Sequence, residues 1–318
     1  MPELCCVVAP QNMDGILDRI AHEVAKSYAC TPKDSSTIIC YDHSNVPPAE
    51  RYFVTHWRLL PSVLQKVNPG THPVTCFFTH VGKGLEETVP ALNLCHSIIA
   101  ESHEGVRILE ELGVNPALIH FVPEGGDSEA FKPHQRSGNG KVLICSNYYP
   151  RKSPTLLLDV IKESPRQFIL LGNGWEKWSG YSELSLQKNF IRSQLPYSGY
   201  PVIFGMCDVF LSVSELEGGG PNALIEAMHA NLFPVVSDTG NAREYIIHRN
   251  NGLIFPQGSS AKHIAALIED AYLRKPQLLP PYNDVYETVA DFTWANFAHQ
   301  VKEVMEGVYS TEKATPFD

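Results

Sequence analysis

Residues 214–228 read SELEGGGPNALIEAM, and this stretch decides how the second half of the chain is interpreted. Gly218 to Gly220 expose backbone amides that a ligand can approach closely. Pro221 suits the first position of a helix, where its missing N–H costs no hydrogen bond, and the N-terminus of such a helix attracts an anion such as a phosphate. The carboxylates of Glu217 and Glu226 suit hydroxyl groups beside that phosphate. A phosphate joined to hydroxyl-rich groups is the chemistry of a nucleotide sugar.

The residues that follow sharpen this interpretation. Phe233–Ser237 is a short apolar run typical of a buried strand, residues 238–244 form a turn entering a helix, and residues 250–255 form a glycine turn into another strand. In this order the elements of residues 208–256 resemble the C-terminal signature of the retaining glycosyltransferases of family 4. For the glycine turn alone, a generic parallel-sheet domain is the alternative.

The resemblance implies an α/β protein of the GT-B fold, with two Rossmann-like doubly wound domains facing each other across a cleft. The alternation of strand and helix patterns along the chain agrees with parallel sheets. We expect an N-terminal acceptor-side domain over residues 1–136 and a C-terminal nucleotide-sugar-binding domain over 137–288. A C-terminal helix over 289–318 would cross back towards the first domain, and the turn-rich segment 133–140 marks the boundary.

Strand and helix patterns can be assigned over most of the chain. Segments 4–9, 37–40, 74–79, 97–101, 119–122, 142–146 and 168–172 have strand patterns, and 16–28, 106–112 and 154–162 have helical patterns. Trp175–Ser198 fits neither. In the N-terminal half, residues 97–133 resemble the interdomain approach of the same family, with a strand ending in serine, a helix, the turn Pro123-Glu124-Gly125-Gly126-Asp127 and the exit Phe131-Lys132-Pro133.

Composition limits the class of protein. The chain has 318 residues, 43% of them hydrophobic and 19% charged, which is ordinary for a soluble globular enzyme. A formal net charge of −10 argues against nucleic-acid binding. The N-terminus lacks a basic leader, and no segment has the length of a membrane span. Eight scattered cysteines favour reduced thiols, so we expect a cytoplasmic protein, with association at the inner face of a membrane left open.

The loop after strand 142–146 carries the charges that the resemblance assigns to the diphosphate. The family has an arginine after this strand and a lysine further on, both holding the diphosphate. Lys152 occupies the lysine position, whereas Asn147 stands where the family has arginine, so a charge is missing there. Arg151 is the neighbouring residue that could compensate. The alternative for Arg151 and Lys152 is a solvated basic pair at a helix start, which the helix dipole disfavours.

The two glutamates match the family's pair, in which the first contacts the donor sugar and the second the nucleotide ribose. Eight residues separate Glu217 from Glu226, one more than in the family pattern. Glu226 is assigned to the ribose and Glu217 to the sugar, with Glu215 as the alternative acid if the loop is aligned differently. Gly219, Gly220 and Asn222 are expected to contact the phosphates.

Two residues of the N-terminal half complete the expected site. His80 follows the apolar run 75–79 and resembles the family's active-site histidine, which contacts the donor sugar across the cleft. Ligands of open α/β sheets bind at the carboxyl ends of strands. Gly15 matches a family glycine near the diphosphate and acceptor, although a plain turn glycine would look the same.

The sequence therefore predicts a metal-independent retaining glycosyltransferase with no cofactor, using a UDP- or GDP-linked sugar as co-substrate. No Asp-x-Asp element is present to hold a cation beside a diphosphate. The acceptor would be a hydroxyl on a glycan, a lipid-linked sugar or a small molecule. The alternatives are a nucleotide-sugar epimerase or phosphorylase of the same fold, and a non-catalytic nucleotide-sugar-binding homologue, which Asn147 and the longer glycine loop would favour.

Overall fold

The computed structural model describes residues 1–13, 15–29, 36–138, 140–216, 223–273 and 284–309. The chain separates into two compact units. Unit 1 comprises Met1–Gly125 and Thr293–Asp318, and unit 2 comprises Gly126–Phe292. In the described residues no helix is long and apolar enough to cross a membrane.

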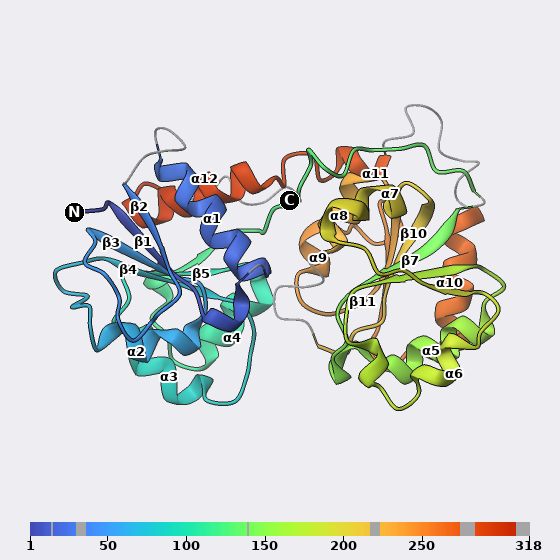
Figure 1. The fold of residues 1–318 in the computed structure, drawn as a ribbon, viewed down its shortest axis with the longest axis horizontal. Coiled ribbons are helices and arrows are strands. Elements are labelled where there is room, and N and C mark those ends of the chain that lie inside the picture. Colours follow the sequence, from blue (N-terminus) through green and yellow to red (C-terminus); the bar gives the residue numbers. More distant parts are fainter. Residues whose placement is uncertain (14, 30–35, 139, 217–222, 274–283, 310–318) are drawn as a thin grey trace. The chain divides into compact units, whose positions relative to one another are not determined.

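Unit 1 is built on a six-stranded, all-parallel sheet in the order β2-β1-β3-β4-β5-β6 (Figure 1). The strands are β1 (Leu4–Val7), β2 (Thr37–Cys40), β3 (Arg51–Val54), β4 (Val74–Phe78), β5 (Ser97–Ala100) and β6 (Ile119–Phe121). The helices are α1 (Ile16–Tyr28), α2 (Leu60–Leu64), α3 (Leu85–Leu92), α4 (His103–Glu111) and α12 (Trp294–Glu306). Short 3₁₀ turns cover Pro10–Asn12, Trp57–Leu59 and Pro116–Leu118.

Both faces of this sheet are buried, because alternate residues of a strand point to opposite faces and each face packs in its own hydrophobic core. Leu4 and Cys6 of β1 belong to the core formed with α1 and α12. Cys5 and Val7 belong to the core beneath α2, α3 and α4. Helix α12 lies side by side with α1 (Figure 1), so the last helix of the chain completes the unit formed by the first.

Unit 2 has a second six-stranded parallel sheet, in the order β12-β11-β10-β7-β8-β9. The strands are β7 (Lys141–Cys145), β8 (Phe168–Leu171), β9 (Phe190–Arg192), β10 (Cys207–Ser212), β11 (Phe233–Ser237) and β12 (Leu253–Phe255). The helices are α5 (Pro154–Glu163), α6 (Tyr181–Ser185), α7 (Tyr200–Phe204), α8 (Ala223–His229), α9 (Ala242–Tyr245), α10 (Ala261–Leu273) and α11 (Asp284–Glu287). Short 3₁₀ turns cover Pro150–Lys152, Trp175–Lys177 and Tyr197–Gly199.

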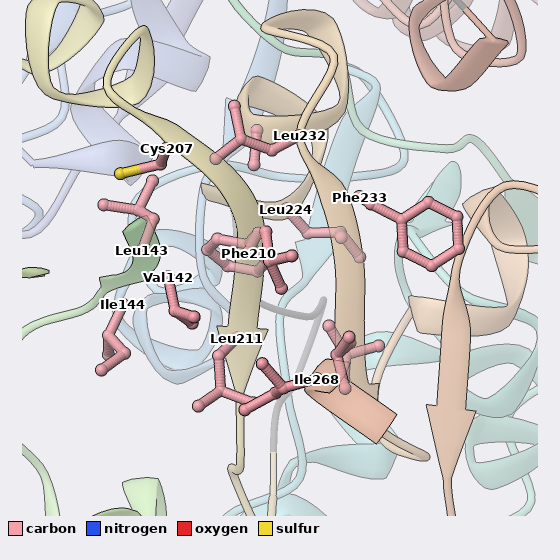
Figure 2. Close-up of a cluster of buried hydrophobic side chains, with 14 of the residues drawn as sticks. Val142, Leu143, Ile144, Cys207, Phe210, Leu211, Leu224, Leu232, Phe233 and Ile268 are labelled. Atoms are coloured by element: carbon pink, nitrogen blue, oxygen red, sulfur yellow. The ribbon is translucent and has the colours of Figure 1, made fainter. Parts of the chain in front are cut away.

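The central strands β7 and β10 organise the core of unit 2. Figure 2 shows Val142, Leu143 and Ile144 of β7 beside Phe210 and Leu211 of β10, all buried. Helices α5 and α10 pack against each other on this sheet. The two parallel α/β sheets confirm the predicted fold class. Strand β3 was not predicted, and the unassigned stretch 175–198 contains α6 and β9.

The chain passes between the units twice, at Gly125–Gly126 and at Phe292–Thr293. Within unit 1, a Cβ on Gly125 would lie 2.2 Å from the carbonyl oxygen of Thr293, so only glycine fits there. Within unit 2, the N–H of Gly126 donates to the carbonyl of Phe292 at 2.8 Å. The two crossing segments are therefore held together on both sides of the division.

Candidate functional site

The strand order of unit 2 identifies where a ligand would bind. The chain runs from β7 outward to β8 and β9, and then returns to place β10 on the other side of β7. The loops after β7 and β10 therefore leave the sheet on opposite sides of this switch point. Open parallel sheets bind ligands in the crevice outside the carboxyl ends of two such strands. The loop with Asn147, Arg151 and Lys152 follows β7, and the glutamate-glycine loop follows β10.

The two loops are joined by hydrogen bonds. The N–H of Glu215 donates to the carbonyl of Arg151 at 2.8 Å, and Nη1 of Arg151 donates to the carbonyl of Leu216 at 3.1 Å. The Arg151 guanidinium also lies over the Tyr149 ring, 5.2 Å from its centroid. Arg151 is thus fixed at the beginning of the glycine loop. The residues of that loop itself, including Glu217, Gly219, Gly220 and Asn222, lie outside the described residues.

Asn147 has a structural partner of its own. Its Oδ1 accepts a hydrogen bond from the N–H of Asn173, 2.7 Å away, in the loop after β8. The backbone there is constrained, because Gly172 has φ +116° and a Cβ on it would lie 2.0 Å from the Ser146 carbonyl oxygen. The side chain of Asn147 therefore ties the loops after β7 and β8 together at the same edge of the sheet.

Lys152 and Glu226 lie close to the same residue at this edge, Cys145, the last residue of β7. Burial raises the pKa of the Cys145 thiol; the charge of Glu226 adds to the rise, and the charge of Lys152 opposes it. Lys152 and Cys145 also line one cavity of about 10 Å³ with Ser212 and Ser214 from the end of β10. Lys152, expected to hold the diphosphate, and Glu226, expected to hold the ribose, therefore both act electrostatically on Cys145 within unit 2.

Glu226 is a buried acid on α8 with only 8% of its surface exposed. A buried carboxylate needs hydrogen-bond donors, and the hydroxyl of Tyr197 donates to its Oε1. Burial raises the pKa of nearby Tyr200, with Cys145 and Glu226 adding to the rise and Arg192 opposing it. Arg192 is held by the carbonyls of Leu170, Gly172 and Ser193. Tyr197 is thus hydrogen-bonded to the acid, and the charges of the acid and of Arg192 act in opposite directions on Tyr200.

In unit 1 the predicted site residue His80 follows β4 and is half-buried. Its Nδ1 lies 2.9 Å from the Thr79 hydroxyl, and its carbonyl accepts a hydrogen bond from Trp57 Nε1 at 2.9 Å. The ring of His56 contacts it edge to face. His56 follows β3, next to the switch point between β1 and β3, and Thr55 joins these strands through a 3.0 Å hydrogen bond to the Val7 carbonyl.

Gly15 is the N-cap residue of α1 and has extended backbone angles. Its N–H donates to the carbonyl of Asn12 at 2.9 Å, and a Cβ would lie 3.0 Å from that carbonyl oxygen. This geometry explains a small residue at the turn, and its expected role near the diphosphate stays a prediction.

Three residues near Glu226, Tyr200 or His80 were not predicted from the sequence: Tyr197, Arg192 and His56. Tyr197 and Arg192 lie in the stretch that fits neither periodicity, and only the fold brings Tyr197 to Glu226. His56 lies two residues after the strand Arg51–Val54, a position that would have indicated a site residue if that strand had been predicted. Among the residues that the structure describes, no group of three or more His, Cys, Asp or Glu side chains could hold a metal ion.

The family of unit 2 follows from its sequence. Residues 127–282 match the family model named Glycosyl transferases group 1, and both sheets have the topology of GT-B proteins. Unit 2 is therefore a glycosyl transferases group 1 domain. No curated protein sequence matches the chain.

Solved structures of the same fold cover nearly the whole chain. Alr3699/HepE from Anabaena, solved with UDP and glucose, has a TM-score of 0.78 at 15% identity, covering 96% of this chain and 100% of that one. Sucrose-phosphate synthase from Thermosynechococcus elongatus has a TM-score of 0.79 at 14% identity, with 97% and 99% covered. The lipopolysaccharide outer core galactosyltransferase WaaB, in its apo form, has a TM-score of 0.73 at 14% identity, with 96% and 99% covered. At these identities the likeness shows the fold alone.

Proposed function

We propose that the protein is a retaining glycosyltransferase that moves a sugar from a nucleoside-diphosphate sugar, UDP- or GDP-linked, to a hydroxyl acceptor. The observation that carries the proposal is that Lys152, after β7, and Glu226, on the helix after β10, both act on Cys145 at the end of β7, beside the β7–β10 switch point of a glycosyl transferases group 1 domain. Solved structures of this fold include Alr3699/HepE with UDP and with UDP-glucose. Retention is proposed from the resemblance to family 4.

The arrangement suits the chemistry of the transfer. The bond between the anomeric carbon and the diphosphate oxygen breaks, a bond to the acceptor oxygen forms, and the acceptor proton is released with the nucleoside diphosphate. Negative charge grows on the departing oxygen, and a preorganised cation or N–H donor aimed at it lowers the barrier. Lys152 supplies that charge in the proposal, with Arg151 fixed beside it. Glu226 accepts ribose hydroxyls, because a carboxylate is an acceptor only.

The first experiment is a thermal-shift screen with UDP, GDP, ADP and their sugars, followed by a turnover assay that includes slow donor hydrolysis. At a hundred times its dissociation constant, the right nucleotide adds about 2.7 kcal/mol to the free energy of unfolding. We expect a shift with UDP or GDP and unchanged turnover after EDTA treatment. Absence of binding to every nucleotide would refute the proposal, and loss of turnover in EDTA would refute metal independence.

One observation favours a second candidate, a nucleotide-sugar-binding protein that does not transfer. Asn147 stands where the resemblance places an arginine, and its side-chain oxygen accepts a hydrogen bond from the N–H of Asn173. Binding with no transfer and no hydrolysis would establish this alternative. An epimerised free nucleotide sugar in the same assay would indicate an epimerase.

A further inference from the structure

The hydroxyl of Tyr197 donates a hydrogen bond to Oε1 of Glu226, the residue expected to hold the ribose. The two side chains come from different elements: Tyr197 from the 3₁₀ turn before α7, and Glu226 from α8. Their exposure differs, with 41% of Tyr197 and 8% of Glu226 accessible to solvent. The tyrosine therefore presents a surface to solvent and to ligands, while the acid behind it is almost enclosed.

Buried aromatic residues hold the Tyr197 ring in place. It packs edge-on against Phe131, with centroids 5.8 Å apart, and in a tilted arrangement against the half-buried Tyr200 at 5.6 Å. Phe131 is 1% exposed and packs in turn on Phe204, the last residue of α7, at 4.6 Å. A tyrosine with this support keeps its hydroxyl in one position, although the side chain is partly exposed.

A hydrogen bond to one oxygen also fixes the direction of the other, because the carboxylate is planar. Glu226 has three rotatable side-chain bonds, and holding them before the ligand arrives reduces the entropy lost on binding. A carboxylate held in one orientation in this way can meet a ribose hydroxyl without first rearranging its side chain.

We propose that Tyr197 is a positioning residue for the donor nucleotide, which orients Glu226 towards the ribose hydroxyls. This inference rests on the proposed function, because it requires Glu226 to face a ribose. It predicts that the hydroxyl of Tyr197 matters only when the ligand carries ribose hydroxyls. A merely structural role would weaken the binding of every nucleotide alike.

The test is a thermodynamic cycle measured by calorimetry. Dissociation constants for UDP and 2′,3′-dideoxy-UDP are compared in wild type, Tyr197→Phe and the matched control Tyr200→Phe. Tyr200 is a suitable control because its ring packs beside that of Tyr197 and is kept in the variant. The hydroxyl that is hydrogen-bonded to Glu226 belongs to Tyr197. If GDP binds more tightly in the screen, GDP and 2′,3′-dideoxy-GDP replace the uridine pair. We expect Tyr197→Phe to raise the dissociation constant of UDP about tenfold, because the variant loses one hydrogen bond to a charged group. The same substitution should change the dissociation constant of the dideoxy nucleotide less than about twofold, because that ligand lacks the ribose hydroxyls. Tyr200→Phe should change the dissociation constant of neither nucleotide.

The other outcomes separate the two proposals. No binding of UDP or GDP to wild type would overturn the proposed function and this inference together. Binding of UDP with no effect of Tyr197→Phe, or an equal effect on both nucleotides, would overturn the role of Tyr197 alone. Equal affinity of wild type for UDP and its dideoxy analogue would overturn it too. In a Glu226→Gln background, the effect of Tyr197→Phe on UDP should shrink to about twofold or less, because the charged acceptor is gone. A persistent tenfold effect there would contradict a role through Glu226.

Discussion

The imidazole rings of His56 and His80 meet edge to face, with their centroids 5.2 Å apart and their planes at 81°. The N–H of Arg58 donates to Nδ1 of His56 at 3.1 Å, so the proton of the neutral His56 ring lies on Nε2. Burial, reinforced by the charges of His80 and Arg58, lowers the pKa of His56 to about 4. His56 therefore stays neutral beside the predicted active-site histidine over the whole physiological range.

This lowered pKa predicts an acid-sensitive stability. Below about pH 6.5 the unfolded chain protonates His56, whereas the folded protein does so only near pH 4. The free energy of unfolding therefore falls as the pH drops from about 6.5 to about 4, by up to about 1.4 kcal/mol per unit of pKa difference. His56→Asn, which keeps an acceptor for the Arg58 N–H, should reduce this dependence. Melting temperatures measured between pH 7 and 4.5 test it, and parallel curves for the two proteins would contradict it.

Lys152→Ala should lower the rate of transfer about a hundredfold while the protein stays folded, because a cation at the departing diphosphate acts mainly in the transition state. Steady-state kinetics with the donor identified in the screen provide the measurement, with circular dichroism as the control for folding. Near-normal activity would move the role to Arg151, which the structure fixes at the beginning of the glycine loop.

The two glutamates should differ in kinetics. A ribose contact is equally strong in ground and transition states, so Glu226→Ala should raise KM about tenfold or more with little change in kcat. Glu217 is assigned to the reacting sugar by the sequence, so Glu217→Ala should lower kcat instead. Identical kinetic profiles would show that these roles are divided wrongly.

Glu101 predicts a pH dependence of the opposite sign. Burial, together with the charge of Glu124 and a hydrogen bond to it, raises the pKa of Glu101 well above its ordinary value. The unfolded chain releases this proton near pH 4.5, whereas the folded protein retains it, so the free energy of unfolding falls as the pH rises above about 4.5. Glu101→Gln, which mimics the protonated acid, should raise the melting temperature at pH 8 by a few degrees relative to wild type and leave it unchanged at pH 4. A uniform shift at both pH values would count against this explanation.

Gly172 should tolerate no side chain. It has φ +116°, and a Cβ would lie 2.0 Å from the Ser146 carbonyl oxygen, so Gly172→Ala should cost about 3 kcal/mol or more in unfolding free energy. Gly174 is a matched control with φ +81° and its nearest atom, Tyr148 Cβ, at 3.7 Å. Gly174→Ala should cost only the backbone term of about 1–2 kcal/mol. Urea denaturation of both variants gives the comparison.

The fold class was predictable because it depends on local patterns. Runs such as residues 74–79 and 142–146 are apolar on both sides of the strand, as a parallel sheet covered by helices on both faces requires. Strand β3 was missed because its four residues begin with a charged arginine and lie between polar loops. The sequence indicates no element in segment 175–198, because the helices there are single turns held by tertiary contacts and have no periodicity to detect.

The sequence by itself determined the two α/β halves and the position of Lys152 after β7, since each depends on residues that are neighbours along the chain. Only the tertiary structure decided that Tyr197 meets Glu226 and that His56 meets His80. Side chains on different loops meet only when the order of the strands brings those loops to the same edge of a sheet. That order is set by how the whole core packs, and no short stretch of sequence encodes it.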